Sequence, residues 1–320
     1  MAITLAEAQK NVQDDLQKGV IDEFRKSSYI LDHLTFDDAV SPTGGGATLT
    51  YGYTRLITQP TADFREVNAE YSPSHVEKER YTVDLKVFGG SFEVDRIIAN
   101  MGGIVDEVQL QIEQKTKAAR ALFNDTFING DSATNAKAFD GLDKALTGST
   151  TEFNIPETLD MSTAEKIKEN YVAFMFYLDK FLKKLDGKPD FIGGNTDFIS
   201  VIQLCSKLAG RYQTTKDDWG RQVETYNGIA LVDFGAKAGS NDDVVKTLAD
   251  GTSSLYFGRL GLDGLHGVSM AGQSPVKTWL PDFSTAGAVK KGEVEMVAAV
   301  ALKASKAAGK MGNVKIAPTA

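Results

Sequence analysis

The sequence contains almost no cysteine. Among its 320 residues the only cysteine is Cys205, so no disulfide can form within the chain, which is typical of proteins from a reducing compartment. Cys205 stands in the apolar run VIQLCSKL. This setting favours a small buried side chain over a catalytic nucleophile.

Motifs for catalysis and for metal binding are also missing. The three histidines, His33, His75 and His266, are scattered, and none forms an H-E-x-x-H motif or a pair with the cysteine. There is no G-x-S-x-G nucleophile elbow. Four glycines recur at every third residue from Gly258 to Gly267, but this spacing does not match the dinucleotide-binding fingerprint. The sequence therefore predicts no catalytic residue, no cofactor and no metal ligand.

Clusters of positive charge and long apolar runs are absent as well. The net charge is −8, and the two lysine pairs, Lys183–Lys184 and Lys290–Lys291, are not extended into basic runs. An acidic chain of this kind is a poor non-specific binder of nucleic acid. No apolar run approaches the ~20 residues of a membrane span, and no signal-peptide pattern opens the sequence. We expect a chain that is made in the cytoplasm and does not enter a membrane.

A long helical pattern is the strongest positive signal. The chain is 42% hydrophobic and 24% charged, which predicts a packed core, and its length suggests about two domains. Apolar residues recur at steps of three or four through residues 105–129, as on one face of an α-helix. We expect the core side of this helix to include Val108, Ile112, Leu122 and Phe123.

A β-ribbon is predicted before this helix. Residues 47–57 and 79–88 alternate apolar and polar side chains, and the polar residues 58–78 separate them. An isolated two-stranded ribbon is only marginally stable in water, so this one should rest on another surface. The glycines at both ends of the ribbon predict hinges: Gly44, Gly45, Gly46, Gly89 and Gly90. The candidates for contacts with another subunit are Arg65, Glu66, Glu70 and Lys78.

The remaining segments suggest an arm and a second domain. Residues 1–43 predict two short helices, which could pack on their own core or on a neighbouring chain. Helical and strand patterns alternate through residues 150–285, which indicates a mixed α/β domain. The apolar segment 293–302 predicts a strand beside the long helix that closes the first domain.

The order of these parts resembles one family of shell proteins. The residues that carry the resemblance are TLTYGYTRLI and RYTVDLKVFGG of the ribbon, the helix VDEVQLQIEQKTKAARALFNDTFING, the following AFDGL, the segment VETYNGI, and the closing VAAVALKASKAAGKMGNVKI. In this order they resemble the major capsid proteins of tailed bacteriophages, which have the Hong Kong 97-like fold. The resemblance covers nearly the whole chain and implies an α+β protein.

The resemblance also implies a domain organisation and a set of partners. The expected parts are an N-terminal arm (1–43), an extended loop (44–90), a peripheral domain (91–149 and 286–320) with a spine helix (105–129), and an axial domain (150–285). Copies of the chain would form hexamers and pentamers of an icosahedral head shell around double-stranded DNA, which the shell would contact non-specifically. A portal, decoration proteins and a separate scaffolding protein are the other expected partners, since only a short arm precedes the ribbon.

The expected location is the virion, after assembly in the cytoplasm of the bacterial host. Some members of the family crosslink a loop lysine to a neighbour. Lys78 and Lys86 are the lysines available here, but no motif assigns such a bond, so we expect non-covalent contacts. Two alternatives stay open. One is an encapsulin-like compartment shell, which has the same fold, and the other is a cytosolic α/β enzyme that uses the glycine-rich residues 258–267.

Overall fold

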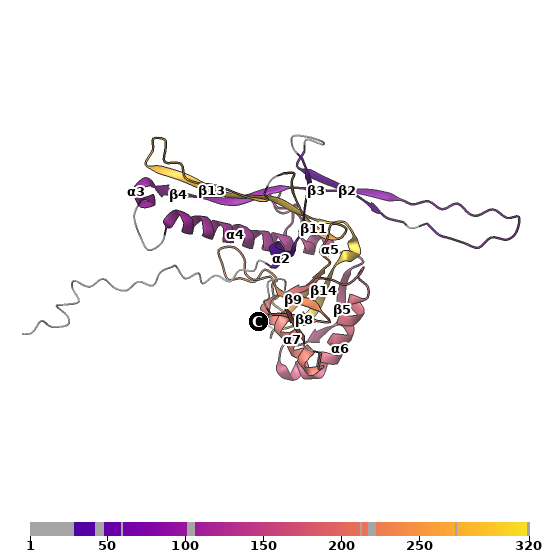
Figure 1. Cartoon of the computed structure of the whole chain (residues 1–320). Helices are drawn as coiled ribbons and strands as arrows, with labels where there is room; N and C mark the ends of the chain where they lie inside the picture. Colours follow the sequence, from indigo (N-terminus) through magenta and orange to yellow (C-terminus); the bar gives the residue numbers. More distant parts are fainter. Residues whose placement is uncertain are drawn as a thin grey trace, which may run out of the picture.

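The chain folds into two sheet-based parts and a projecting ribbon (Figure 1). The computed structural model describes residues 29–41, 48–58, 60–100, 106–211, 213–216, 222–272 and 274–318. One part is elongated and consists of a five-stranded sheet with a long helix along it. The other part is built on a seven-stranded sheet, and the two-stranded ribbon extends away from both. This mixture of helices and sheets confirms the predicted α+β class.

The long helix α4 runs from Glu107 to Asn129, close to the predicted range. Asp106 is its N-cap, and its carboxylate accepts hydrogen bonds from the backbone N–H groups of Val108 and Gln109 at 2.9 and 3.1 Å. The helix ends at Gly130, where a Cβ atom would lie 2.2 Å from the carbonyl oxygen of Phe139. The close approach of the next loop therefore requires glycine at this position.

The five-stranded sheet is organised around β13, Val289–Leu302. Its first part lies between β4 (Lys86–Asp95) and β12 (Val276–Trp279), and its last part pairs with β11 (Leu265–Met270). Strand β1 (Phe36–Val40) adds to β11 in parallel. Helix α4 packs on β4 and β13. The predicted strand beside the long helix is thus present, and it is longer than expected.

The second sheet has seven strands, in the spatial order β5-β14-β10-β6-β9-β8-β7. Helices α6 (Ala164–Leu182) and α7 (Thr196–Leu208) pack on one face of it. Its strands are β5 (Glu152–Asp160), β6 (Phe191–Gly194), β7 (Gln213–Lys216), β8 (Gln222–Tyr226), β9 (Ile229–Asp233), β10 (Thr252–Gly258) and β14 (Ala308–Lys315).

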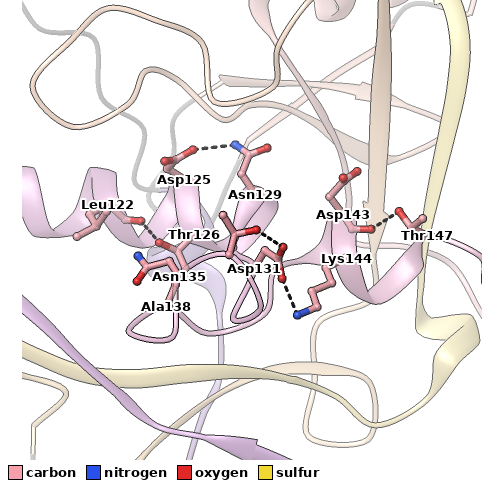
Figure 2. Close-up of a pocket in the computed structure, with 12 residues that line it drawn as sticks. Leu122, Asp125, Thr126, Asn129, Asp131, Asn135, Ala138, Asp143, Lys144 and Thr147 are labelled. Atoms are coloured by element: carbon pink, nitrogen blue, oxygen red, sulfur yellow. Dashed lines mark hydrogen bonds and ion pairs between the residues drawn. The ribbon is translucent and has the colours of Figure 1, made fainter.

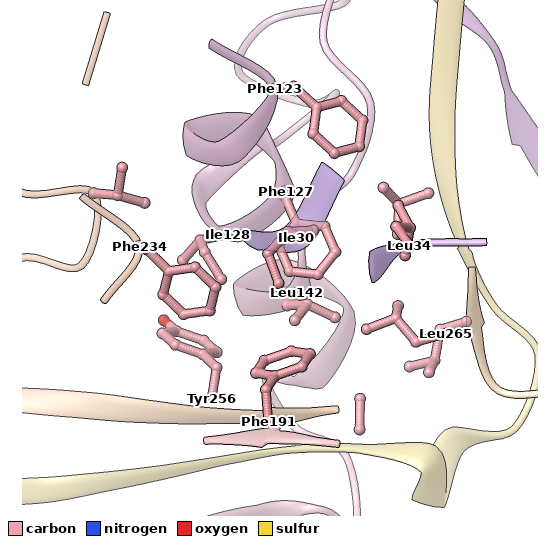
Figure 3. Packing of buried hydrophobic residues seen from close by; sticks show 14 of the residues in the cluster. Ile30, Leu34, Phe123, Phe127, Ile128, Leu142, Phe191, Phe234, Tyr256 and Leu265 are labelled. Atoms are coloured by element: carbon pink, nitrogen blue, oxygen red, sulfur yellow. The ribbon is translucent and has the colours of Figure 1, made fainter. Parts of the chain in front are cut away.

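A continuous apolar core joins the two parts (Figure 3). Phe127 and Ile128 at the end of α4 pack with Phe191 and Tyr256 of the seven-stranded sheet, and with Phe234 that follows β9. The ring centroid of Phe127 lies 6.5 Å from that of Phe191 and 6.3 Å from that of Phe234. The short helix α5 (Leu142–Leu146) also contributes buried leucines. The end of the long helix is thus the structural link between the two sheets.

The predicted domain boundary near residue 285 does not follow the sheets. Strands β11 and β12 precede this boundary but belong to the five-stranded sheet, whereas β14 follows it but belongs to the seven-stranded sheet. Between β13 and β14 the chain passes from one sheet to the other through the short helix η2, Ser305–Ala307. The sequence pattern carries no information on which sheet completes the hydrogen bonds of a strand.

The described part of the N-terminal arm packs on its own chain. It contains the short helix α2 (Tyr29–His33) and strand β1, where only helix had been expected. Ile30 and Leu34 are buried in the same core as α4. The first predicted helix of the arm and Gly44, Gly45 and Gly46 lie outside the described residues.

The predicted core side of α4 is correct only in part. Phe123 is fully buried, with its ring centroid 5.6 Å from Phe139 and 6.2 Å from Phe88. Val108 and Ile112 are half-buried. Leu122 is 38% exposed, so its assignment to the core is wrong. Adjacent helical residues point about 100° apart, and only Phe123 faces the phenylalanine cluster.

The expected hinge at Gly89 and Gly90 is also wrong, because β4 passes through both residues without a break. They pair with Glu295 and Val294 of β13. A Cβ atom on Gly89 would lie 2.0 Å from the carbonyl oxygen of Val294. Glycine is thus needed here for close contact between strands rather than for bending.

We expect Gly89→Ala to destabilise the subunit by about 2 kcal/mol or more, because the rigid backbone of β13 has to shift. Gly90→Ala is the matched control. Its Cβ would meet only the flexible Lys115 side chain, at 3.2 Å, so its cost should be below about 1 kcal/mol. Denaturant unfolding of the unassembled subunits measures both values. Equal stability of the two variants would contradict the packing role of Gly89.

Candidate functional site

The ribbon consists of β2 (Thr50–Leu56) and β3 (Lys78–Asp84), which pair in antiparallel register with Tyr53 opposite Tyr81. Between them lies a long loop, whose described residues 57–58 and 60–77 form no helix or strand. Figure 1 shows the loop extending well beyond both sheets. The sequence predicted this arrangement from the alternating side chains on either side of a polar stretch.

The base of the ribbon is fastened to the five-stranded sheet by three side chains of β2. Tyr51 donates a hydrogen bond from its hydroxyl to Asp37 Oδ2 at 2.7 Å. Tyr53 donates to the carbonyl oxygen of Leu302 at 2.9 Å, and Arg55 Nε donates to that of Lys303 at 2.8 Å. This anchor was not among the sequence predictions. The alternation Tyr-x-Tyr-x-Arg on one face of β2 was the available signal.

The two anchoring tyrosines remain protonated over the whole neutral range. Burial raises the pKa of Tyr51 well above its usual value, and the hydrogen bond to Asp37 raises it further. Burial also raises the pKa of Tyr53, although the neighbouring Arg55 partly opposes this. Both hydroxyls are therefore permanent donors, and the anchor does not depend on tyrosine ionisation.

The far part of the ribbon exposes apolar side chains. Phe64 is 107% exposed and Val67 is 88% exposed, with Leu56, Ile57 and Tyr71 also on the surface. Hydrogen bonds in this segment join nearby parts of the ribbon: for example, the N–H of Ile57 donates to the carbonyl oxygen of Glu77 at 2.9 Å. Apolar groups gathered on a segment with no support from its own chain are typical of an interaction site.

The four predicted contact residues all lie on this exposed segment. Arg65 shapes the turn, because its Nη1 donates to the carbonyl oxygens of Glu66 and Ala69, both at 3.2 Å, and its guanidinium lies 5.3 Å from the Tyr71 ring centroid. Glu70 is exposed and Lys78 opens β3 opposite Leu56. Their role between subunits stays a prediction.

A second exposed apolar patch lies at the opposite end of the five-stranded sheet, around α3 (Arg96–Ala99). Ile97 (69% exposed) and Ile98 lie on α3, and Trp279 and Leu280 (65% exposed) at the end of β12 are exposed as well. The elongated part of the chain therefore presents apolar surface at both of its ends.

A polar pocket of about 670 Å³ lies beside the end of α4 (Figure 2). Its walls are held by internal pairs: Lys144 Nζ lies 2.6 Å from Asp131 Oδ1, and Asn129 donates to Asp125 at 2.7 Å. The Lys144 ammonium holds the pKa of Asp131 well below its usual range. Within the described ranges, no three His, Cys, Asp or Glu side chains gather closely enough to hold a metal ion. The pocket shows charges that neutralise one another rather than a catalytic arrangement.

The glycine-rich residues 258–267 have packing roles. A Cβ atom on Gly258 would lie 2.6 Å from the Phe191 ring, and one on Gly267 would lie 2.5 Å from the Phe36 ring. These two glycines make room for the aromatic side chains of Phe191 and Phe36. None of the described helices combines the length and apolarity needed to cross a bilayer.

Comparison with known proteins gives similarity of structure without similarity of sequence. No protein-family model and no curated protein matches the sequence. Among solved structures, the SrpI encapsulin from Synechococcus elongatus PCC 7942 matches with a TM-score of 0.68 and 12% identity over 99% of this chain and 97% of that one. A chain from Mycobacterium phage Bobi matches with a TM-score of 0.61 and 13% identity over 97% and 98%. The capsid of the native GTA particle matches with a TM-score of 0.60 and 12% identity over 96% and 97%.

The chain has the Hong Kong 97-like capsid fold. The matches cover 96–99% of this chain, so the shared fold includes the ribbon, the long helix and both sheets. The order of the sequence motifs had indicated this fold. Because the identities are only 12–13%, the comparison establishes the fold. What the chain does has to be argued from its own surface.

Proposed function

We propose that this chain is a structural subunit that assembles with copies of itself into a closed protein shell. The observation that carries the proposal is the ribbon. Its base is fastened to its own sheet, but its loop extends beyond both sheets and exposes Phe64, Val67 and Tyr71. Burial of these side chains on a neighbour would remove that apolar surface from water.

Such a contact joins two different surfaces, the ribbon of one copy and the body of the next. A heterologous contact of this kind, repeated by rotation, closes into rings. The rings are hexamers and pentamers in our proposal, with the ribbon as the extended loop, the five-stranded sheet and α4 as the peripheral part, and the seven-stranded sheet as the axial part. Arg65, Glu66, Glu70 and Lys78 contact the neighbouring subunit. The apolar patch around α3 offers a further contact between rings.

The first candidate for the assembled particle is the icosahedral head of a tailed bacteriophage, which encloses double-stranded DNA. Its partners are a portal, a scaffolding protein and decoration proteins, and assembly takes place in the bacterial cytoplasm. The net charge of −8 supports a head filled by a packaging motor, since such a shell does not need a basic interior to condense its genome. The chain itself is not an enzyme in this proposal.

The second candidate is an encapsulin-like compartment, which the match to the SrpI encapsulin favours. Both candidates place the chain in a shell of identical subunits. They differ in the content of the particle, which is DNA in the first and protein cargo in the second.

Purification of the chain expressed alone tests the proposal, with light scattering for mass and negative-stain microscopy for shape. We expect pentamers, hexamers or shells. Particles from the native source should contain nuclease-protected DNA if they are heads, and a cargo protein without DNA if they are compartments. A compact monomer or dimer that binds a nucleotide would contradict both candidates and favour the cytosolic α/β enzyme.

A further inference from the structure

Four side chains from different elements meet beneath the base of the ribbon. Asp37 comes from β1, Tyr51 from β2, His266 from β11, and Lys303 directly follows β13. The carboxylate of Asp37 accepts the hydrogen bond from Tyr51, and Lys303 Nζ lies 3.8 Å from the same carboxylate. Lys303 Nζ also lies 5.4 Å from the centroid of the Tyr51 ring. The cluster therefore connects the ribbon with three strands of the sheet.

His266 is the buried member of this cluster. Its side chain is fully buried, and neither ring nitrogen has a hydrogen-bond partner among the described residues. The ring of Tyr51 meets it edge to face, with centroids 5.8 Å apart and an interplanar angle of 77°. A neutral imidazole fits this contact as a flat, weakly polar surface. An imidazolium here would be a buried cation near the Lys303 ammonium that the Gly264 backbone stabilises only in part, which is costly.

The charges around His266 do not favour its protonation. Burial lowers the pKa of His266 below its ordinary value, and the Lys303 ammonium lowers it further. The backbone of Gly264 and the carboxylates of Asp37 and Asp263 oppose this only in part. Oδ2 of Asp37 already accepts from Tyr51 and faces Lys303, so its charge is partly compensated by the Lys303 ammonium.

We propose that His266 makes the attachment of the ribbon base to its own sheet depend on pH, with protonation of His266 releasing Tyr51 and the strand that carries it. The consequence for assembly depends on the proposed function, because the direction of the ribbon sets its contact with the neighbouring subunit. The release itself is a property of the single chain.

The sign of the effect follows from proton linkage. With the base detached, His266 is exposed to water and has an ordinary pKa of about 6.5, whereas the attached form has a lower pKa. The detached form therefore binds more protons in the interval between the two values. Attachment is independent of pH above about 6.5, and below it the attachment constant falls by up to about tenfold per pH unit.

A buried reporter beside the cluster can measure this release in the unassembled full-length chain. Leu85 is 4% exposed and packs in the same small core as Tyr51, so a Leu85→Cys thiol reacts only when the base detaches. The thiol is labelled with an aromatic disulfide that reacts at acid pH, and the labelling rate is measured at each pH. This rate is divided by the labelling rate of an Ala238→Cys variant, whose thiol is exposed, at the same pH. The native Cys205 is fully buried in the other core and serves as a blank.

We expect the labelling ratio to change by less than about twofold from pH 7.5 to 6.5 and to rise by up to about fivefold between pH 6.5 and 5.5. His266→Leu should abolish the rise, and His75→Gln, on the exposed loop, should leave it unchanged. If His266→Leu does not fold, Lys303→Met should reduce the rise, because removal of the ammonium raises the pKa of attached His266.

A flat ratio in the wild-type background would overturn the inference, as would an equal rise after His266→Leu. Neither result depends on shell formation, because the assay uses unassembled chains. Conversely, a chain that shows the release but never assembles would refute only the proposed function.

Discussion

Replacement of residues 58–76 by Asn-Gly is expected to leave a folded subunit that no longer forms stable shells. The loop makes few contacts with its own chain, and the backbone hydrogen bond between Ile57 and Glu77 positions these two residues for a two-residue turn. The free energy of unfolding should therefore change by less than ~1 kcal/mol. Assembly should fail because the apolar contacts of Phe64, Val67 and Tyr71 with the neighbour are lost. Denaturant unfolding and negative-stain microscopy give the two readouts.

The triple substitution Phe64→Ser, Val67→Ser and Tyr71→Ser is the matched control, because it keeps the length of the loop. It should weaken assembly nearly as much as the deletion if apolar burial drives the contact. Normal shells from the deletion variant would refute the role of the loop. Normal shells from the triple variant alone would instead assign the contact to the backbone and to charged residues such as Arg65 and Glu70.

The second large effect is expected in the core that links the two sheets. Phe123→Ala should destabilise the subunit by about 3–5 kcal/mol, because it leaves a cavity among the rings of Phe88, Phe127 and Phe139. These three rings cannot all move inward to fill the space. The midpoint of denaturant unfolding, at an unchanged slope, measures the loss.

Leu122→Ala is the control for this prediction, since it removes a side chain of similar class from the neighbouring position of the same helix. Leu122 is 38% exposed, so its truncation should cost about 1 kcal/mol or less. Equal losses from the two variants would show that the face of α4 assigned to the core is wrong.

The position of Leu122 illustrates the limit of periodicity in this chain. Apolar residues at both 122 and 123 satisfy a 3.6-residue period, so the pattern could not decide which of them faces inward. The decision comes from Phe88 on β4 and Phe139 in the loop after α4. Both lie outside the helix, and only the tertiary structure brings them to Phe123.

Gly89 and Gly90 show a related limit. A pair of glycines after a strand is typical of a turn or hinge, and this local rule suggested flexibility. The structure places β13 so close to Gly89 that no side chain fits there. A partner more than two hundred positions later in the sequence requires this glycine, and no local pattern can report such a contact.

The candidate site was likewise predictable from the sequence only in part. Alternation of side chains predicted the two strands of the ribbon, and the polar stretch between them predicted that its loop would be exposed. The anchor of Tyr51, Tyr53 and Arg55 depends on Asp37 and on the backbone of residues 302 and 303. The buried position of His266 likewise depends on β1, β2 and the end of β13 meeting at one place.

Local patterns in the sequence specified the long helix, predicted at 105–129 and found at 107–129, and the ribbon before it, because periodicity and turn residues act over a few neighbouring positions. The tertiary structure decided which strands share a sheet, where glycine is obligatory and which histidine is buried. These features arise from contacts between segments far apart in the chain, where packing and hydrogen bonding depend on distance in space rather than on order in sequence.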